Sequence, residues 1–261
     1  MTFSKPSRPR QFFASVPVPC PYLASRVERK LVIELAGEDA PALFSELSRA
    51  GFRRSHGFAY RPACRDCVAC VPVRIRVDDF VASRSLRRVL RRNADLTVTD
   101  LPPRATQEQY RLFSAYQRGR HANSEMATMT FEDFALMVQA TPVRTSLAEI
   151  RDHDARLVGG ILIDHTGDGL SAVYSFFDPD LAARSLGTFA VLWMVDRARS
   201  LGLPHVYLGY WIGGSDTMDY KRRFPALEGL RGGSWVPMPA EAERRDPAPI
   251  AAGQGSTSSL P

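Results

Sequence analysis

The apolar pattern in the second half of the chain restricts the fold more than any other feature. Three strand-like segments, residues 144–151, 156–164 and 169–178, follow one another with turn signals between them, which predicts an antiparallel meander. A helical pattern over residues 187–201 comes next, followed by a strand-like segment over residues 205–212. Three strands, a helix and another strand indicate an α/β (α+β) fold with a mixed sheet, in which the helix is a crossover connection.

The first half of the chain mixes short strand-like and helical patterns. We expect strands over residues 31–35, 52–60 and 71–77, and helices over residues 39–50, 83–92, 106–120 and 131–140. After Met238 the composition changes to Pro, Ala, Gly and Ser, which supply too few apolar groups to order a segment. We therefore predict an N-terminal region over residues 1–100, an α/β domain over 101–238 and a disordered tail over 239–261.

Three of the four cysteines lie close together in the N-terminal region. They form the run Cys64-x-x-Cys67-x-x-Cys70, and Cys20 lies far upstream as a possible fourth ligand. Two residues between thiolates allow a tight turn to place both sulfurs on one ion, so the set is compatible with an iron–sulfur cluster or a Cys₄ zinc site. The alternative is a turn that holds reduced cysteines. The spacing predicts a metal site without identifying the metal.

Arginine supplies nearly all of the positive charge. The chain has 34 Lys and Arg residues against 28 Asp and Glu, a formal net charge of +6, and only three of the basic residues are lysines. Arginine pairs bidentately with phosphate and carboxylate groups, which favours a polyanionic partner. Five arginines lie on the helix predicted over residues 83–92, with no acidic residue to pair with: Arg84, Arg87, Arg88, Arg91 and Arg92. A phosphate backbone would relieve their repulsion, so we predict that this face binds nucleic acid; a merely solvated face is the alternative.

A basic residue and a glycine lie at the turn between the last meander strand and the following helix. The segment from Arg184 to Gly187 is similar to the pyrophosphate-binding turn of the acetyltransferase fold, where amides at a helix N-terminus hold phosphate. The similarity is incomplete, because Phe189 stands where that turn has Gly or Ala. This departure argues against coenzyme A as a donor, and close packing at the helix start is the alternative interpretation.

No segment predicts a membrane location. The chain has no run of 18 or more apolar residues, and its first 22 residues lack a continuous apolar core and a small-residue cleavage site. We expect a cytoplasmic protein with no membrane partner.

Several blocks of sequence resemble a known family. These are Gly51-Phe52-Arg53-Arg54-Ser55, the cysteine run with the flanking Tyr60-Arg61-Pro62, Pro72 and Arg74, Cys20-Pro-Tyr22-Leu23, Tyr207-Leu208-Gly209-Tyr210-Trp211-Ile212, Met218, Tyr220-Lys221 and Gly233-x-Trp235. Together they resemble the bacterial aspartate/glutamate leucyltransferases of the arginyl-tRNA–protein transferase family. The resemblance covers about residues 10 to 238.

The resemblance implies a tRNA-dependent aminoacyltransferase of the N-degron pathway. Such an enzyme moves leucine from leucyl-tRNA to the N-terminal amine of a protein that begins with Asp or Glu, and thereby targets that protein for degradation. The implied fold is an acetyltransferase-like (GNAT) mixed sheet beside the cysteine-bearing N-terminal region. The implied partners are leucyl-tRNA and the acceptor protein, and the transfer itself is expected to need no cofactor.

The chemistry of aminoacyl transfer suggests roles for individual residues. An aminoacyl ester is already activated, so the enzyme has mainly to position the amine and stabilise the tetrahedral oxyanion. We predict that Asp178, at a strand end, is the base or the anchor of the amine, with a capping role at Asp-Pro as the alternative. Tyr174 or Tyr220 would donate to the oxyanion or to the leaving ribose hydroxyl, unless both are packing residues. Arg184 and Gly187 would form the donor turn.

Selection of an acidic N-terminal side chain requires a fixed cation near the amine. Arg74, Arg76 and Lys221 are the predicted substrate-binding residues, because a bidentate pair between arginine and a carboxylate would reject Asn and Gln. The alternative is that Arg74 and Arg76 are surface residues of an edge strand.

Three other functions stay open at this point. Arginyl-tRNA is an alternative donor, and an acetyl-CoA-dependent N-acetyltransferase would explain the turn at Arg184. A non-enzymatic nucleic-acid-binding or redox-sensing protein with a metal cluster would explain the cysteines and the basic helix. That last alternative leaves the aromatic block at residues 207–211 unexplained.

Overall fold

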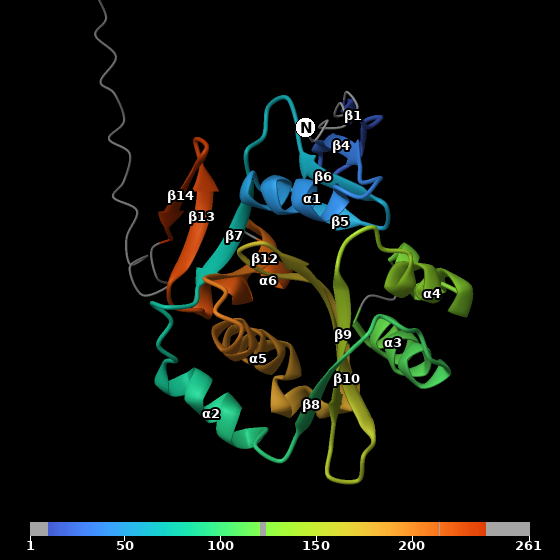
Figure 1. The fold of residues 1–261 in the computed structure, drawn as a ribbon, viewed down its shortest axis with the longest axis vertical. Helices are drawn as coiled ribbons and strands as arrows, with labels where there is room; N and C mark the ends of the chain where they lie inside the picture. The colour runs from blue at the N-terminus through green and yellow to red at the C-terminus, as the bar shows by residue number, and fades with distance from the viewer. Residues whose placement is uncertain (1–9, 121–123, 214, 239–261) are drawn as a thin grey trace, which may run out of the picture.

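Two sheets of unequal size lie one above the other (Figure 1). The computed structural model describes residues 10–120, 124–213 and 215–238. The smaller sheet has the order β1-β4-β6-β5 and contains β1 (Phe12–Ala14), β4 (Lys30–Glu34), β5 (Arg53–Ser55) and β6 (Phe58–Pro62). β2 (Val18–Pro19) and β3 (Val27–Glu28) form a separate two-stranded ribbon. Helix α1 (Ala40–Arg49) connects β4 to β5 and completes this N-terminal lobe.

The larger sheet is mixed and has eight strands in the order β14-β13-β7-β12-β11-β10-β9-β8. Its strands are β7 (Cys70–Arg76), β8 (Thr97–Leu101), β9 (Thr145–Arg151), β10 (Leu157–Thr166), β11 (Gly169–Phe177), β12 (His205–Ile212), β13 (Leu227–Arg231) and β14 (Ser234–Pro237). Adjacent strands are antiparallel except for β11 and β12, which are parallel because a helix connects them. The predicted α/β mixed sheet, with its meander, crossover helix and final strand, is confirmed.

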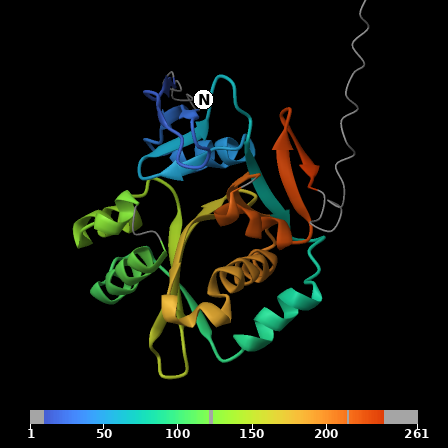
Figure 2. The same ribbon diagram turned by 180° about the vertical axis from the view of Figure 1, so that it is seen from behind.

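Helices cover both faces of the larger sheet (Figures 1 and 2). α3 (Gln107–Arg120) packs on β10 and β11 from one side together with α4 (Phe131–Gln139), while α5 (Leu186–Ser200) packs on β11 and β12 from the other. α2 (Arg84–Arg92) lies outside α5. The short helical segments are η1 (Glu125–Thr128), η2 (Pro179–Arg184), α6 (Asp216–Asp219) and η3 (Tyr220–Arg223). None of the helices in the described ranges combines the length and apolar character needed to cross a membrane.

Each sheet has its own hydrophobic core. The smaller core is formed by side chains of β4, α1 and β6, with Phe44 and Ile33 at its centre, and Val143 of the other lobe reaches into it. The larger core lies on both faces of the eight-stranded sheet and includes the fully buried rings of Phe113 and Phe176. Burial of apolar area in these cores is the main stabilising contribution to the fold.

The capping residues at the ends of the helices form the expected hydrogen bonds and backbone conformations. Ser83 Oγ accepts a hydrogen bond from Leu86 N at the start of α2. At the start of α3, Thr106 Oγ1 accepts from Gln109 N at 3.2 Å and Gln109 Oε1 accepts from Thr106 N at 2.9 Å, which is a capping box. Gly51 ends α1 with φ +83°, a conformation that favours glycine.

The strand predictions need two corrections. The single strand expected over residues 52–60 is the hairpin β5–β6, which turns at His56-Gly57 with His56 at φ 51°. β1, β2, β3, β8, β13 and β14 were not expected, since each has five residues or fewer.

β7 places part of the expected N-terminal region in the larger sheet. It pairs with β12 on one side and with β13 on the other, and β8 forms the far edge of the same sheet. The two cores therefore divide near residue 70, whereas the sequence predicted a division near residue 100. The tail expected over residues 239–261 lies outside the described residues.

Candidate functional site

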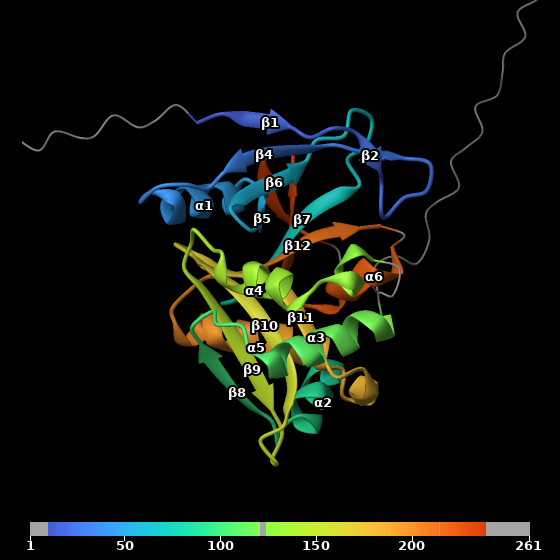
Figure 3. The same cartoon turned by 90° about the vertical axis from the view of Figure 1, so that its right-hand side faces the viewer.

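The two parallel strands β11 and β12 separate soon after they begin. Their pairing covers only Gly169–Ser171 against His205–Tyr207. In Figure 3, β12 runs across the view while β10 and β11 run downward, so the backbones of β11 and β12 diverge. We call the place where β11 and β12 part the strand separation. β12 also has an irregularity against β7 between Tyr207 and Gly209, where Gly209 takes φ +76°. A bulge of this kind re-aims the strand and leaves backbone groups of β11 without a neighbouring strand.

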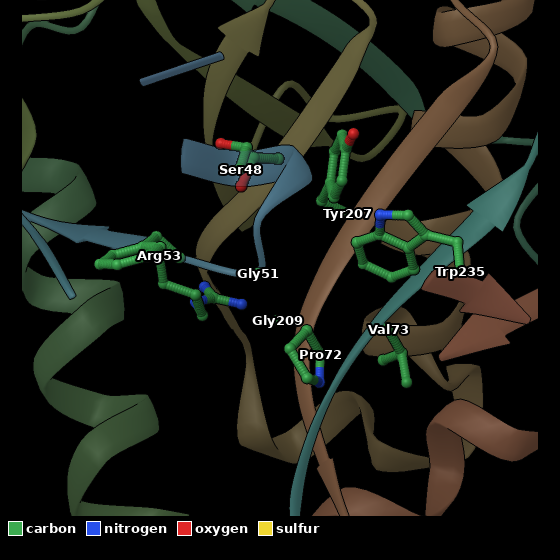
Figure 4. A pocket seen from close by; sticks show the side chains of 10 residues that line it. Ser48, Gly51, Arg53, Pro72, Val73, Tyr207, Gly209 and Trp235 are labelled. Carbon is green, nitrogen blue, oxygen red and sulfur yellow. The ribbon is translucent and has the colours of Figure 1, made fainter. Parts of the chain in front are cut away.

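Arg53 of the N-terminal lobe fills the space between the separating strands. Its Nη2 donates to Ala172 O at 2.6 Å and to Val173 O at 3.0 Å, the two carbonyl groups that follow the last β11–β12 pair. A Cβ atom on Gly209 would overlap the guanidinium, so only glycine leaves room for it. Figure 4 shows the guanidinium of Arg53 beside Gly209. Both residues line a narrow pocket of about 10 Å³, which is room for about one water molecule.

The neighbouring residue, Arg54, fixes this part of β5 to the larger sheet. Arg54 and Asp164 of β10 form a bidentate ion pair with distances of 2.6 and 2.8 Å, and both side chains are fully buried. Thr145 Oγ1 donates to Asp164 Oδ1 at 2.7 Å. Consecutive residues of a strand point to opposite faces, so Arg54 holds the lobe in place while Arg53 reaches the strand separation.

Lys221 occupies the other side of the separation. Only 5% of this residue is exposed, and its Nζ donates to the carbonyl of Tyr210 on β12 and lies 3.4 Å from Met218 Sδ. Burial, together with the nearby charge of Arg53, lowers the pKa of Lys221 to about 7. The predicted substrate-binding residue Lys221 therefore lies beside β12, next to the residue that follows Gly209.

Two of the predicted catalytic tyrosines border the same region. Tyr174 of β11 accepts a hydrogen bond at 2.7 Å from Nε2 of Gln117, a fully buried residue of α3. Tyr220 of η3 packs its ring against Phe224. Burial raises the pKa of both tyrosines above the usual value, so both hydroxyl groups stay protonated at neutral pH and can donate.

Asp178, the predicted base, has partners for both carboxylate oxygens. Oδ1 accepts from Asp180 N at 2.9 Å, which caps η2, and Oδ2 accepts from Arg156 Nη1 at 3.0 Å. This arrangement favours the capping interpretation over proton transfer.

Arg74 and Arg76 lie on β7 beside an acidic residue that the sequence did not connect to them. Arg74 Nε donates to Glu228 Oε2 at 2.8 Å, and its guanidinium stacks over the Trp235 ring at 4.3 Å. Arg76 is 2.8 Å from Asp79 and 3.9 Å from Glu228. Both cations are thus already paired, and neither lies free to read an acidic substrate.

The predicted donor turn is closely packed. Arg184 Nε donates to Asn93 Oδ1 at 3.0 Å and its Nη2 bonds Arg92 O and Asp95, so its side chain ties η2 to the end of α2. A Cβ on Gly187 would lie 3.1 Å from the Phe177 ring. Both residues of the predicted turn therefore have structural partners.

The five arginines of α2 are all exposed (Arg84, Arg87, Arg88, Arg91 and Arg92). Within the part of the chain that the structure describes, none of them makes an ion pair; Arg87 and Arg92 donate to the carbonyl groups of Ala82 and Ala183. The helix therefore presents an uncompensated positive face, as the sequence predicted.

The cysteines do not form a ligand set. In the described ranges, no three Cys, His, Asp or Glu side chains are arranged to hold a metal ion, so Cys20, Cys64, Cys67 and Cys70 do not fit the expected iron–sulfur cluster or zinc site. All four are free and half-buried. Burial and the neighbouring cysteines, Cys20 first among them, raise the pKa of Cys70 to about 11.

Sequence reasoning missed Arg53, Gly209 and Gln117 as site residues. Arg53 and Gly209 stand in the blocks that carry the family resemblance, but no local pattern shows that they meet across the two lobes. Gln117 looks like an ordinary polar position of an amphipathic helix, and only its burial distinguishes it.

Comparison with known proteins agrees with these blocks. The family described as "Arginine-tRNA-protein transferase, C terminus" matches residues 108–231, and the one described as its N terminus matches residues 18–88. An aspartate/glutamate leucyltransferase of Paramagnetospirillum magneticum is 54% identical over 228 residues, covering 87% of this chain and 93% of that protein. The chain belongs to this family. The leucyltransferase of Gluconacetobacter diazotrophicus is 49% identical over 249 residues, or 94% of this chain and 96% of that protein.

Solved structures resemble the chain more distantly than these family members do. L-PGS from Bacillus licheniformis aligns with a TM-score of 0.45 at 13% identity, over 71% of this chain and 55% of that one. FemX aligns with a TM-score of 0.44 at 11% identity, over 72% of this chain and 64% of that one.

Proposed function

We propose that this protein transfers leucine from leucyl-tRNA to the N-terminal amine of proteins that begin with Asp or Glu, and so targets them for degradation. The observation that carries this proposal is the identity of 49–54%, over 87–94% of the chain, with relatives named aspartate/glutamate leucyltransferase. Charged tRNA as the donor places the reaction in the cytoplasm. No cofactor is required, because the ester bond of the donor is already activated.

The α2 face is our candidate for the contact with tRNA. The C-terminal end of α2 is hydrogen-bonded to η2: Asn93 bonds Arg184, and Arg92 donates to Ala183 O. α2 therefore cannot shift independently of the crossover connection that follows β11. Phosphates bound on α2 would then be held at a fixed distance from the strand separation. This fixed placement suits a donor whose reactive ester must reach the site from a large nucleic acid.

At the strand separation, the attacking group is the α-amine of the acceptor, whose pKa is near 8. A useful fraction is unprotonated at neutral pH, so the site does not depend on a strong base. Attack on the ester carbonyl forms a tetrahedral oxyanion. The protonated hydroxyl groups of Tyr174 and Tyr220 are suited to stabilise it and to protonate the leaving ribose oxygen. We assign Asp178 the capping role.

The structure disfavours coenzyme A as the donor. Arg184 is engaged by Asn93 and Asp95, and Gly187 packs closely on Phe177, so the turn before α5 offers no free cation for a pyrophosphate. Arginyl-tRNA stays as a second candidate donor, since the matched family is described as an arginine-tRNA-protein transferase.

The decisive experiment supplies purified protein with leucyl-tRNA carrying labelled leucine and a peptide that begins with Asp. We expect labelled leucine at the peptide N-terminus. Parallel reactions with arginyl-tRNA and acetyl-CoA identify the donor. Transfer from arginyl-tRNA but not from leucyl-tRNA would make arginyl-tRNA the donor. The absence of transfer from any charged tRNA would exclude the proposed function.

A further inference from the structure

Two basic residues lie at the separation of β11 and β12 without an acidic partner. In the described ranges, neither Arg53 nor Lys221 makes an ion pair; their bonds go to backbone carbonyl groups and a thioether. Arg54 shows the usual arrangement for a buried cation, since it pairs with Asp164. Buried charges are ordinarily paired, yet the buried Lys221 and the partly buried Arg53 have no carboxylate partner among the described residues, so their positive charge is uncompensated there.

The two cations bond to the two separating strands, one cation to each strand. Arg53 donates to carbonyl groups of β11, while Lys221 donates to the carbonyl of Tyr210 on β12. Arg53 lies against Gly209, and Lys221 bonds the next residue of β12, so the two like charges are near each other. Burial first, and the charge of Arg53 second, lower the pKa of Lys221, which is the direction expected for mutual repulsion. An anion placed between the strands would lie against both and would relieve that repulsion.

We propose that Arg53 and Lys221 form the subsite that reads the acidic side chain of the acceptor's first residue. This inference rests on the proposed function and names the residues behind its specificity. The carboxylate accepts hydrogen bonds from the free guanidinium nitrogens of Arg53 and from the ammonium of Lys221. The adjacent α-amine then lies at the strand separation, near the hydroxyl of Tyr174.

The paired state of the other candidates supports this assignment. Arg74 and Arg76 share Glu228, so an acidic substrate would have to compete with a carboxylate already in place. Arg53 has no such competitor and is held rigidly, because the Arg54–Asp164 pair fixes β5. Gly209 completes the subsite by leaving space for the guanidinium.

The chemistry of the subsite explains how Asp and Glu would be distinguished from Asn and Gln. A carboxylate only accepts hydrogen bonds, whereas an amide presents an NH₂ donor to one of two groups that are themselves only donors. The amide would therefore leave a buried donor unsatisfied as well as a charge unpaired, and both effects penalise the wrong substrate.

The test compares leucyl transfer to two peptides that differ only in an N-terminal Asp or Asn. For the wild-type protein we expect a strong preference for Asp in kcat/KM. Arg53→Gln and Lys221→Met should each lower kcat/KM for the Asp peptide by about 10–100-fold, while transfer to the Asn peptide changes little. Arg53→Lys should retain part of the preference, because it keeps the charge without the bidentate fork.

The matched controls are Arg111→Gln and Lys30→Met. Arg111 is an exposed arginine of α3, and Lys30 pairs with Glu28 in the N-terminal lobe. Both should keep the wild-type preference. The proposed subsite would be overturned if Arg53→Gln and Lys221→Met kept the wild-type preference for the Asp peptide, or if they lost kcat/KM equally for the Asp and Asn peptides. Neither result would contradict the transfer function. If Arg53→Gln does not fold, Arg53→Lys and Lys221→Met decide. If the wild-type protein leucylates neither peptide, the proposed function itself fails.

Discussion

Tyr174 and Asp178 are close in sequence, near the end of one strand, yet their surroundings differ. The Tyr174 hydroxyl receives a hydrogen bond from Gln117 and keeps its own proton free to donate. Both oxygens of Asp178 are engaged by Arg156 and by the backbone of Asp180. The sequence placed both residues near the end of β11, but it could not distinguish a donor from a cap, because their partners come from the turn before β10, from α3 and from η2.

Substitution of these two residues should separate the roles. Tyr174→Phe removes a donor to the oxyanion and should lower kcat by about 10–100-fold with little change in KM. Asp178→Asn keeps an oxygen that can cap η2 and should leave kcat within about a factor of three. Steady-state kinetics of leucyl transfer measure both, with circular dichroism as the control for folding. A large loss of kcat in Asp178→Asn alone would restore Asp178 as the base.

The lowered pKa of Lys221 leads to a specific pH dependence. A lysine is charged below its pKa, so the Lys221 cation is present below about pH 7 and is lost above it. The acceptor amine becomes nucleophilic as pH rises through about 8. Burial raises the pKa of the neighbouring Tyr220, so its hydroxyl stays neutral in this range. For an Asp peptide, kcat/KM should therefore pass through a maximum at about pH 7.5.

Lys221→Met provides the control for this pH profile. It should remove the falling limb of kcat/KM for the Asp peptide and leave the rising limb of the amine. An unchanged bell-shaped profile in this variant would show that another group is responsible.

Arg74 and Arg53 show what a single sequence can and cannot indicate about a site. Alternation along residues 71–77 correctly predicted a strand with Arg74 and Arg76 on one face. It could not show Glu228, which β13 brings beside Arg74 from far along the chain. Arg53 had no local signal at all, because its contacts lie on β11 and β12 of the other lobe.

At the scale of elements, α2 was predicted most completely, because everything that defines it is local. Its N-cap, its exposed arginines and its buried Leu86 follow from the spacing of residues within one helix, although Leu90, expected on the same buried face, is 38% exposed. The hairpin β5–β6 and the strands β13 and β14 were harder, since short strands acquire their stability from neighbours that are remote in sequence.

Neutralising the α2 face should weaken tRNA binding without changing specificity. The triple variant Arg84→Gln/Arg88→Gln/Arg91→Gln should lower affinity for charged and uncharged tRNA alike, and reduce the slope of log K against log salt by about 2–3. Filter binding across a salt series measures this. A matched triple of exposed arginines elsewhere, Arg104→Gln/Arg111→Gln/Arg144→Gln, should leave the slope unchanged. Equal slopes for both triples would remove α2 from the interface.

At the scale of the whole molecule, polar contacts join two lobes that have separate cores. Arg54 pairs with Asp164, the Tyr210 hydroxyl donates to Gly51 O at 3.0 Å, and Trp235 Nε1 donates to Arg49 O at 3.0 Å. The sequence predicted the mixed α/β fold, but it could not show these contacts. Each contact joins residues more than a hundred positions apart.

Asp164→Asn should destabilise the protein strongly. It leaves the Arg54 guanidinium buried without its charge partner and should lower the free energy of unfolding by about 3–5 kcal/mol. Urea unfolding measures this. The double variant Arg54→Met/Asp164→Leu removes both charges and should lose less than the single variant. If the double variant lost as much free energy of unfolding as Arg54→Met and Asp164→Leu lose together as single variants, the pair would contribute no specific coupling.

The position of β7 has a consequence for synthesis of the chain. β7 is made early, yet both of its neighbours, β12 and β13, begin only at His205 and Leu227. While the ribosome is still translating, this apolar strand has two open edges that nothing yet made can cover. Nascent chains stalled before residue 205 should therefore depend on chaperones, and no truncation between β7 and the end of β13 should yield a stable fragment.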